Sequence, residues 1–166
     1  MAEKEPIIKE KLDNSGVFDF KAIYSFANSW LKDEGFGVVE DKYSEKVSGS
    51  SREISVEWNI RKEMSDYFIL EGGVGIEVKG MTDVEVEIEG ERKRMNKGKI
   101  SISIKGALVT DPKSKWDENN FYRFLRDIYN KYIIPGRIEH MKSLVKEKII
   151  AFKEELKAVL ELSGRR

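Results

Sequence analysis

Between Ile54 and Leu108, apolar side chains occupy even-numbered positions and mostly polar side chains stand between them. A period of two is typical of β-strands with one buried face, because successive side chains of a strand point to opposite faces. One polar face favours antiparallel over parallel pairing. The even-numbered set is Ile54, Val56, Trp58, Ile60, Phe68, Leu70, Val74, Ile76, Val78, Val84, Val86, Ile88, Ile100, Ile102, Ile104 and Leu108.

The same parity predicts how the strands pair. Residues directly opposite one another in an antiparallel pair share a face, so even positions must face even positions and each turn must have an odd length. Three-residue turns at 80–82 and 96–98 satisfy this rule, and Gly98 suits the left-handed position of a turn with a bulge. These turns pair Val78 with Val84, Gly72 with Gly90, Met95 with Lys99, Glu89 with Lys105, and Gly106 with Ile88.

Glycines inside the predicted strands include Gly72, Gly90 and Gly106. Interior glycines weaken a strand but permit a sharp bend or the close approach of another backbone. We interpret them as a crease where the sheet curls around a helix. The alternative is a phosphate-binding loop at Gly72–Gly75, but such a loop needs a helix N-terminus after it, and another strand follows here.

Three segments carry apolar residues at spacings of three and four, which is typical of amphipathic helices. Asp19 can cap the first helix and Asp117 the second, and Pro135 breaks the chain before the third. The third segment predicts a helix about 35–40 Å long. The predicted helices cover residues 20–34, 117–134 and 137–162, and two further strands cover 38–47 and 52–61.

The fold class expected from these segments is α+β. An N-terminal helix packs on a bent five-stranded antiparallel meander of order 1-2-3-4-5, and two C-terminal helices follow, the last one long and amphipathic. Residues 1–17 are expected to be flexible, 18–162 to form a single domain and 163–166 to be a disordered tail. As an order of elements this layout resembles cystatin-like folds and the N-terminal domain of Hsp90-activating co-chaperones. No motif accompanies the resemblance, so no functional residue follows from it.

Composition excludes several classes of site. The chain of 166 residues has no cysteine, which excludes disulfides, thiol catalysis and cysteine-ligated metals. Its 30 basic and 30 acidic residues give zero formal charge, which argues against a nucleic-acid binder as a whole. The high charged content of 36% is typical of a thermophile. We find neither a signal peptide nor a run long enough to cross a membrane, and we expect a cytoplasmic protein.

No nucleophile–base pair, metal motif or cofactor motif is evident, so we expect no enzyme, no cofactor and no metal site. His140 is the only histidine, and a surface position is the simpler interpretation. Glu85, Glu87 and Glu89 form an acidic row on one strand face. Such a row can bind a divalent cation, but we interpret it as a solvated face that discourages wrong pairing.

The first interpretation of function is a non-enzymatic interaction or assembly module. Its long C-terminal helix outruns the width of a five-stranded sheet at ~4.8 Å per strand, so its stripe predicts a homo-oligomer or a protein partner. The stripe consists of Ile138, Met141, Val145, Ile149, Phe152, Leu156 and Val159.

Two alternatives stay open. One is a carrier of small apolar ligands with a pocket between the curled sheet and the helices. The other is an adaptor that contacts nucleic acid or anionic lipid through a basic hairpin tip at residues 92–99. The basic residues of this tip are Arg92, Lys93, Arg94, Lys97 and Lys99.

Overall fold

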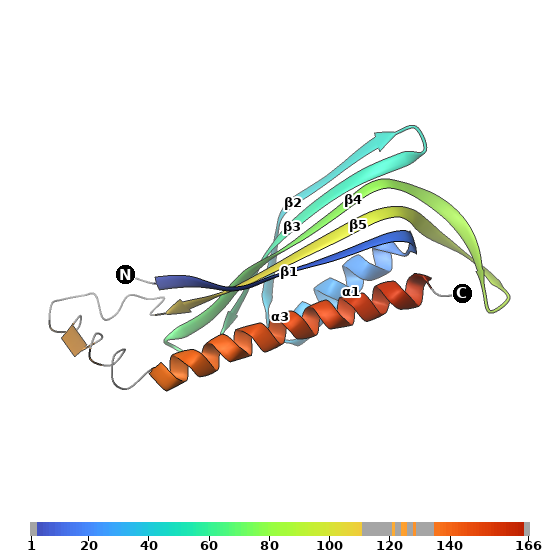
Figure 1. The fold of residues 1–166 in the computed structure, drawn as a ribbon. Helices are drawn as coiled ribbons and strands as arrows, with labels where there is room; N and C mark the ends of the chain where they lie inside the picture. The colour runs from blue at the N-terminus through green and yellow to red at the C-terminus, as the bar shows by residue number, and fades with distance from the viewer. Residues whose placement is uncertain (1–2, 111–120, 122–123, 126–127, 129–134, 165–166) are drawn as a thin grey trace.

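The structure, a computed structural model, describes residues 3–110, 121, 124–125, 128 and 135–164. One antiparallel sheet of five strands carries both long helices of this part of the chain on the same side (Figure 1). The elements are β1 (Glu3–Phe18), α1 (Phe20–Asp33), β2 (Gly37–Ser48), β3 (Ser51–Glu63), β4 (Phe68–Ile88), β5 (Glu91–Thr110) and α3 (Pro135–Gly164).

The alternation of apolar residues is confirmed as the organising pattern of the sheet. Val56, Ile76 and Ile102 are buried, whereas the residues beside them in the chain, such as Glu57 and Glu77, are exposed. The buried side is the one that α1 and α3 cover, and it is called the inner face below. The fold is therefore α+β with a five-stranded antiparallel sheet, as predicted.

The strand order corrects the predicted meander. The sheet runs β1-β5-β4-β3-β2, so the segment predicted to be flexible forms an edge strand beside β5. Its pattern was hard to recognise because two inward positions of β1 carry acids. Lys142 of α3 lies 3.1 Å from Glu5, and Lys153 lies 3.1 Å from Glu10. Inward acids that pair with helix lysines break the apolar alternation that identifies the other strands.

The two predicted three-residue turns are wrong. β4 continues through 80–82 and β5 through 96–98, and the chain reverses at Glu89 and Gly90. Both residues have positive φ, 51° and 81°, as a two-residue type I′ turn requires. A register shift between Lys79 and Thr82 inserts extra residues and changes the parity, so that Val84 lies opposite Met95. An even-length turn thus becomes compatible with the buried pattern.

Other predicted pairs change with the turns. Val78 lies opposite Ile100, and Lys105 lies opposite Gly73 instead of Glu89. Gly72 lies opposite Gly106, whereas Gly90 is part of the turn. A Cβ atom on Gly106 would stand 2.8 Å from Cγ1 of Ile149, so this glycine lets α3 approach the sheet closely.

Helix α3 buries its apolar stripe within its own chain. Val145, Phe152 and Leu156 are 0% exposed, and the ring of Trp30 from α1 stacks on Phe152 with centroids 5.0 Å apart. Lys148 adds an ion pair with Glu34 at 2.6 Å, which lowers the pKa of that carboxyl. Three helices were predicted, and the described residues contain two long ones, α1 and α3; the predicted helix at 117–134 lies mostly outside the described residues.

Candidate functional site

The interior between sheet and helices is filled by large side chains. Phe18, Trp58, Phe68 and Phe152 are each 2% exposed or less and lie in one continuous core. An open depression lies instead on the opposite, outer face of the sheet. Residues of all five strands line it, and its volume is about 840 Å³. We call it the outer groove. A twisted sheet is hollow along one diagonal of each face, which explains a groove that crosses the strands.

One row of paired residues runs across the outer groove. Lys9 of β1 lies opposite Lys105 of β5, which lies opposite Gly73 of β4, which lies opposite Asn59 of β3. The Asn59 amide donates a hydrogen bond to the carboxylate of Asp41 in β2. The row therefore places two amines at one end of the groove and a carboxylate at the other.

The next row has a similar order. Ser103 of β5 lies opposite Gly75 of β4, which lies opposite Glu57 of β3. A Cβ atom on Gly75 would stand 2.9 Å from the hydroxyl oxygen of Ser103. The serine hydroxyl therefore leans over the glycine. Gly73 and Gly75 form the floor, because no side chain rises from β4 at these two outward positions.

The walls of the outer groove have opposite charges. The basic wall consists of Lys4, Lys9 and Lys105 from β1 and β5, and the acidic wall consists of Asp41, Glu57 and Glu71 from β2, β3 and β4. Among the residues that the structure describes, one ion pair links the walls, between Lys4 and Glu71 at 3.4 Å. A second groove of about 900 Å³ adjoins this end and shares Lys4, Asn59 and Glu71 with it.

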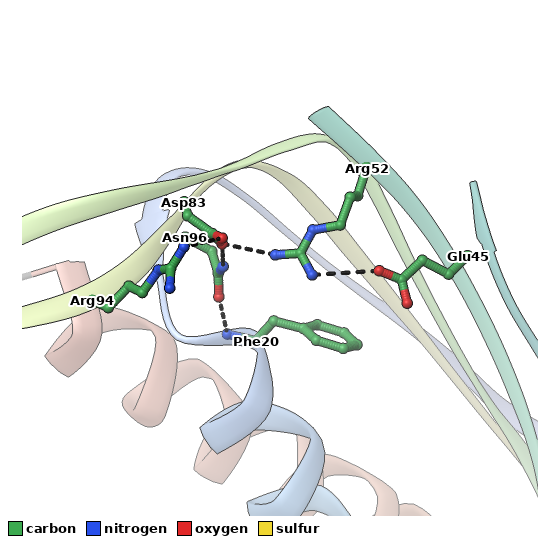
Figure 2. A network of polar contacts seen from close by, with 6 residues as sticks. All are labelled: Phe20, Glu45, Arg52, Asp83, Arg94 and Asn96. Carbon is green, nitrogen blue, oxygen red and sulfur yellow. Dashed lines mark hydrogen bonds and ion pairs between the residues drawn. The ribbon is translucent and has the colours of Figure 1, made fainter. Parts of the chain in front are cut away.

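A polar network joins the β4–β5 hairpin to the start of α1 (Figure 2). The carboxylate of Asp83 accepts hydrogen bonds from Arg52 at 2.7 Å, Arg94 at 3.1 Å and Asn96 at 3.0 Å. Asn96 in turn accepts a hydrogen bond from the backbone N–H of Phe20 at 3.0 Å. Asp83 and Asn96 thus find their partners within the chain, and the network serves to hold the hairpin and the helix together.

Two N–H groups at the N-terminus of α1 donate to side chains of this chain. The Asp19 side chain accepts a hydrogen bond from the backbone N–H of Ala22 at 3.2 Å, and Asn96 takes that of Phe20. Helix N-termini bind anions through such N–H groups, and here two of them already have partners. Asp19 is the N-cap that the sequence predicts.

A tyrosine–glutamate contact joins α1 to β2. The Tyr24 hydroxyl donates to Glu40 at 2.5 Å, and the indole N–H of Trp58 donates to the same oxygen at 3.2 Å. Burial, followed by the Glu40 contact, raises the pKa of Tyr24 to about 12. Burial and the charge of Glu45 also raise the pKa of Tyr43. Both phenols stay protonated at neutral pH and cannot act as bases there.

The basic residues predicted at a hairpin tip lie along β5 instead. Arg92 pairs with Glu85 at 3.7 Å and Arg94 with Asp83 at 3.1 Å, so acids of β4 oppose part of the positive charge. Lys93, Lys97 and Lys99 lie on the same strand and are exposed.

The acidic row does not form a metal cluster. Among the described residues, no three His, Asp or Glu side chains gather closely enough to hold a metal ion. Glu87 lies opposite Arg92, Glu89 is in the turn, and His140 is exposed on α3.

The predicted partner stripe is part of the core. Val145, Ile149, Phe152 and Leu156 are at most 1% exposed, and Ile138, Met141 and Val159 are partly buried against the same core. The stripe therefore offers little free surface. The core of this chain already covers the apolar residues that suggested an interface there.

The outer groove was missed by sequence reasoning because its basic wall comes from an unrecognised strand. Lys9 meets Lys105 only once β1 is placed beside β5. One signal was present in the sequence. Gly73 and Gly75 occupy odd, outward positions where neighbouring strands carry polar side chains, but a glycine run of this kind also fits a crease or a phosphate loop.

Comparison with protein-family models, with curated proteins and with solved structures finds no match for this chain. None of the helices in the described part of the chain combines the length and the hydropathy that a membrane span requires. The geometry of the outer groove is thus the main basis for an inference about function.

Proposed function

We propose that this chain is a non-enzymatic binding module whose binding surface is the outer groove. Its volume of about 840 Å³ falls in the range of sites that hold drug-sized ligands, roughly 300–1,000 Å³. Opposed basic and acidic walls supply polar groups that can orient a ligand. This proposal keeps the non-enzymatic interaction class expected from the sequence. It places the binding surface in the outer groove instead of on α3.

The observation that carries the proposal is the presence of glycine at position 73. Gly73 has no positive φ, and a Cβ atom added to it would have the Trp58 carbonyl oxygen as its nearest neighbour at 3.6 Å, an ordinary contact. The fold therefore has room for a larger residue. Glycine in a strand interior costs about 0.5–1 kcal/mol relative to alanine. A need to keep the groove floor open explains why a destabilising residue stands there.

The experiment is a ligand screen read by amide chemical shifts. A mixed library of small molecules and short peptides is titrated into the labelled protein and into Gly73→Val, which fills the floor. Ser55→Val is the matched control, because Ser55 lies on the outer face of β3 outside the groove lining. We expect shifts at Lys105, Gly73 and Asn59 that Gly73→Val removes and Ser55→Val keeps.

Binding that maps to another surface, or that survives in Gly73→Val, would contradict this function. Thermal unfolding of each variant shows that lost binding comes from the filled groove and not from a lost fold. A screen in which no library member shifts the groove amides would also count against the proposal.

A second candidate is pairing with a protein strand at the free edge of β2. Val39, Tyr43 and Val47 are 61%, 48% and 69% exposed there, which is unusual for large apolar residues on a 12-residue edge strand. A bulge at Asp41 and the charge of Lys42 oppose such pairing. If β2 pairs, Ser44→Pro should abolish self-association or partner binding in sedimentation while the groove screen is unchanged.

A further inference from the structure

Two lysines face each other directly across β1 and β5 at the basic wall. Lys9 and Lys105 are register partners on the outer face, and among the described residues neither has an ion-pair partner. Like charges directly opposite in a sheet are destabilising. An anionic group placed between these two amines would turn an unfavourable pair into a favourable site.

A hydroxyl and an open floor lie next to this lysine pair. Ser103 lies two residues before Lys105 on the same face, and its hydroxyl leans over Gly75. Gly73 lies opposite Lys105, so no β4 side chain separates the amines from the space above the floor. Two ammonium groups and one hydroxyl are a donor set that suits a carboxylate.

Two acids of the acidic wall lie across the floor from Lys105: Glu57 two strands away and Asp41 three strands away. Glu57 and Asn59 are on β3, and the Asn59 amide already donates to Asp41, so carboxylate oxygens remain there to accept from a cation. Lys42 is the register partner of Glu57, yet no ion pair joins them in the part of the chain that the structure describes. Strand spacing of ~4.8 Å places the backbone of Glu57 about 10 Å and that of Asp41 about 14 Å from Lys105.

We propose that the outer groove binds a short zwitterionic peptide, with its carboxylate at Lys9, Lys105 and Ser103 and its ammonium at Asp41 and Glu57. This inference rests on the proposed function, because it assigns a ligand class to the same groove. A peptide of three residues spans at most ~3.6 Å per residue, about 10 Å, which matches the separation of Lys105 from Glu57. A single amino acid is too short to reach both.

The test uses triglycine as the probe, with free glycine and N-acetylated, C-amidated triglycine as controls. We expect triglycine to shift the groove amides and to bind about tenfold more tightly than the capped peptide, which lacks both end charges. Free glycine should bind as weakly as the capped peptide. Added salt should weaken triglycine binding, because both contacts are between exposed charges.

Two variants test the walls, one variant for each wall. Lys105→Met and Glu57→Gln should each weaken triglycine binding about fivefold. Lys79→Met is the matched control: Lys79 forms a second lysine pair with Lys99 on the same face, outside the outer groove. It should leave affinity unchanged. The melting temperature of Lys105→Met should stay equal or rise, because the variant removes the repulsion from Lys9.

The outcomes separate the ligand class from the function. Equal binding of capped and free triglycine, or no effect of Lys105→Met, overturns the zwitterion while groove binding stands. If triglycine does not bind but library ligands map to the groove, the zwitterion is again overturned and groove binding stands. If triglycine binds elsewhere and Gly73→Val binds every ligand normally, both proposals fall.

Discussion

Two pairs of glycines occupy the central strands β4 and β5, one pair on each face of the sheet. Gly72 and Gly106 point to the inner face, where added Cβ atoms would collide with the Lys105 carbonyl oxygen and stand 2.8 Å from Ile149, respectively. Gly73 and Gly75 point outward, where the nearest atoms are an ordinary contact at 3.6 Å and a movable hydroxyl. The inner pair is required by packing, and the outer pair is not.

This difference shows how one residue type can have two roles in the same strand. On the inner face, glycine lets α3 and the neighbouring backbone approach closely, and the dense core leaves no freedom to add an atom. On the outer face, glycine removes side chains from a surface that tolerates them. A residue that the fold does not need is a stronger indication of function than one that the fold requires.

The largest effect is expected from alanine at the inner glycines. Gly72→Ala forces a Cβ atom against a backbone oxygen, and Gly106→Ala forces one against Ile149 and Val145 of α3. Overpacking of this kind costs about 1–3 kcal/mol. Chemical denaturation should show a lower free energy of unfolding for both variants. Wild-type stability of either variant would show that the inner face is looser than its distances indicate.

An intermediate effect is expected at the polar network of Figure 2. Asp83→Ala leaves Arg52 and Asn96 without their shared acceptor and loosens the hairpin from α1. The Asp83 carboxylate is partly exposed, so we expect a loss of about 1–2 kcal/mol in the free energy of unfolding. Arg94→Ala is the control, because Arg94 is 78% exposed and its pair should contribute little. Equal losses in both variants would contradict the central role of Asp83.

A smaller effect is expected at Tyr24, and it depends on pH. The pKa of Tyr24 is raised to about 12 from 10 in the folded state, so between these pH values the folded chain holds a proton that the unfolded chain has released. Stability from this group is therefore complete below pH 10 and is lost as pH rises toward 12.

Tyr24→Phe removes the hydrogen bond to Glu40 and should cost about 1 kcal/mol near neutral pH. Its deficit relative to the wild type should shrink through the alkaline window, as followed by denaturation at several pH values. Tyr43→Phe serves as the comparison, because the pKa of Tyr43 is also raised but no hydrogen bond joins it to Glu40 among the described contacts. A deficit that stays constant with pH would rule out titration of Tyr24.

The sequence predicted what depends on local pattern and missed what depends on distant partners. Alternation from Ile54 to Leu108 identified the inner face, and Asp19 identified the start of α1, because both signals lie within a few residues. The strand β1 was missed because the partner of Glu10 is Lys153, 143 positions away. No local rule predicts that an inward acid will find such a partner.

Dependence on distant partners also explains why the turns and the site were not predicted. A three-residue turn and a register shift both satisfy the parity at Lys79, and the choice between them is made by the long β4–β5 hairpin. The outer groove needs five strands in their final order, with β1 at the edge. Its floor was visible as Gly73 and Gly75, but its walls appear only after Lys9 and Lys105 meet.

The smallest change in stability is expected for a glycine-to-alanine change on the outer face. Gly73→Ala adds the same methyl group as Gly72→Ala, one residue later in β4, and meets only an ordinary contact. Alanine restricts the unfolded chain, so the variant should be about 0.5 kcal/mol more stable than the wild type. Adjacent positions should thus differ in the sign of their effect, as measured by denaturation of both variants in parallel. If Gly73→Ala were instead as destabilised as Gly72→Ala, packing would explain both glycines, and the argument from an unneeded glycine to a binding groove would lose its premise.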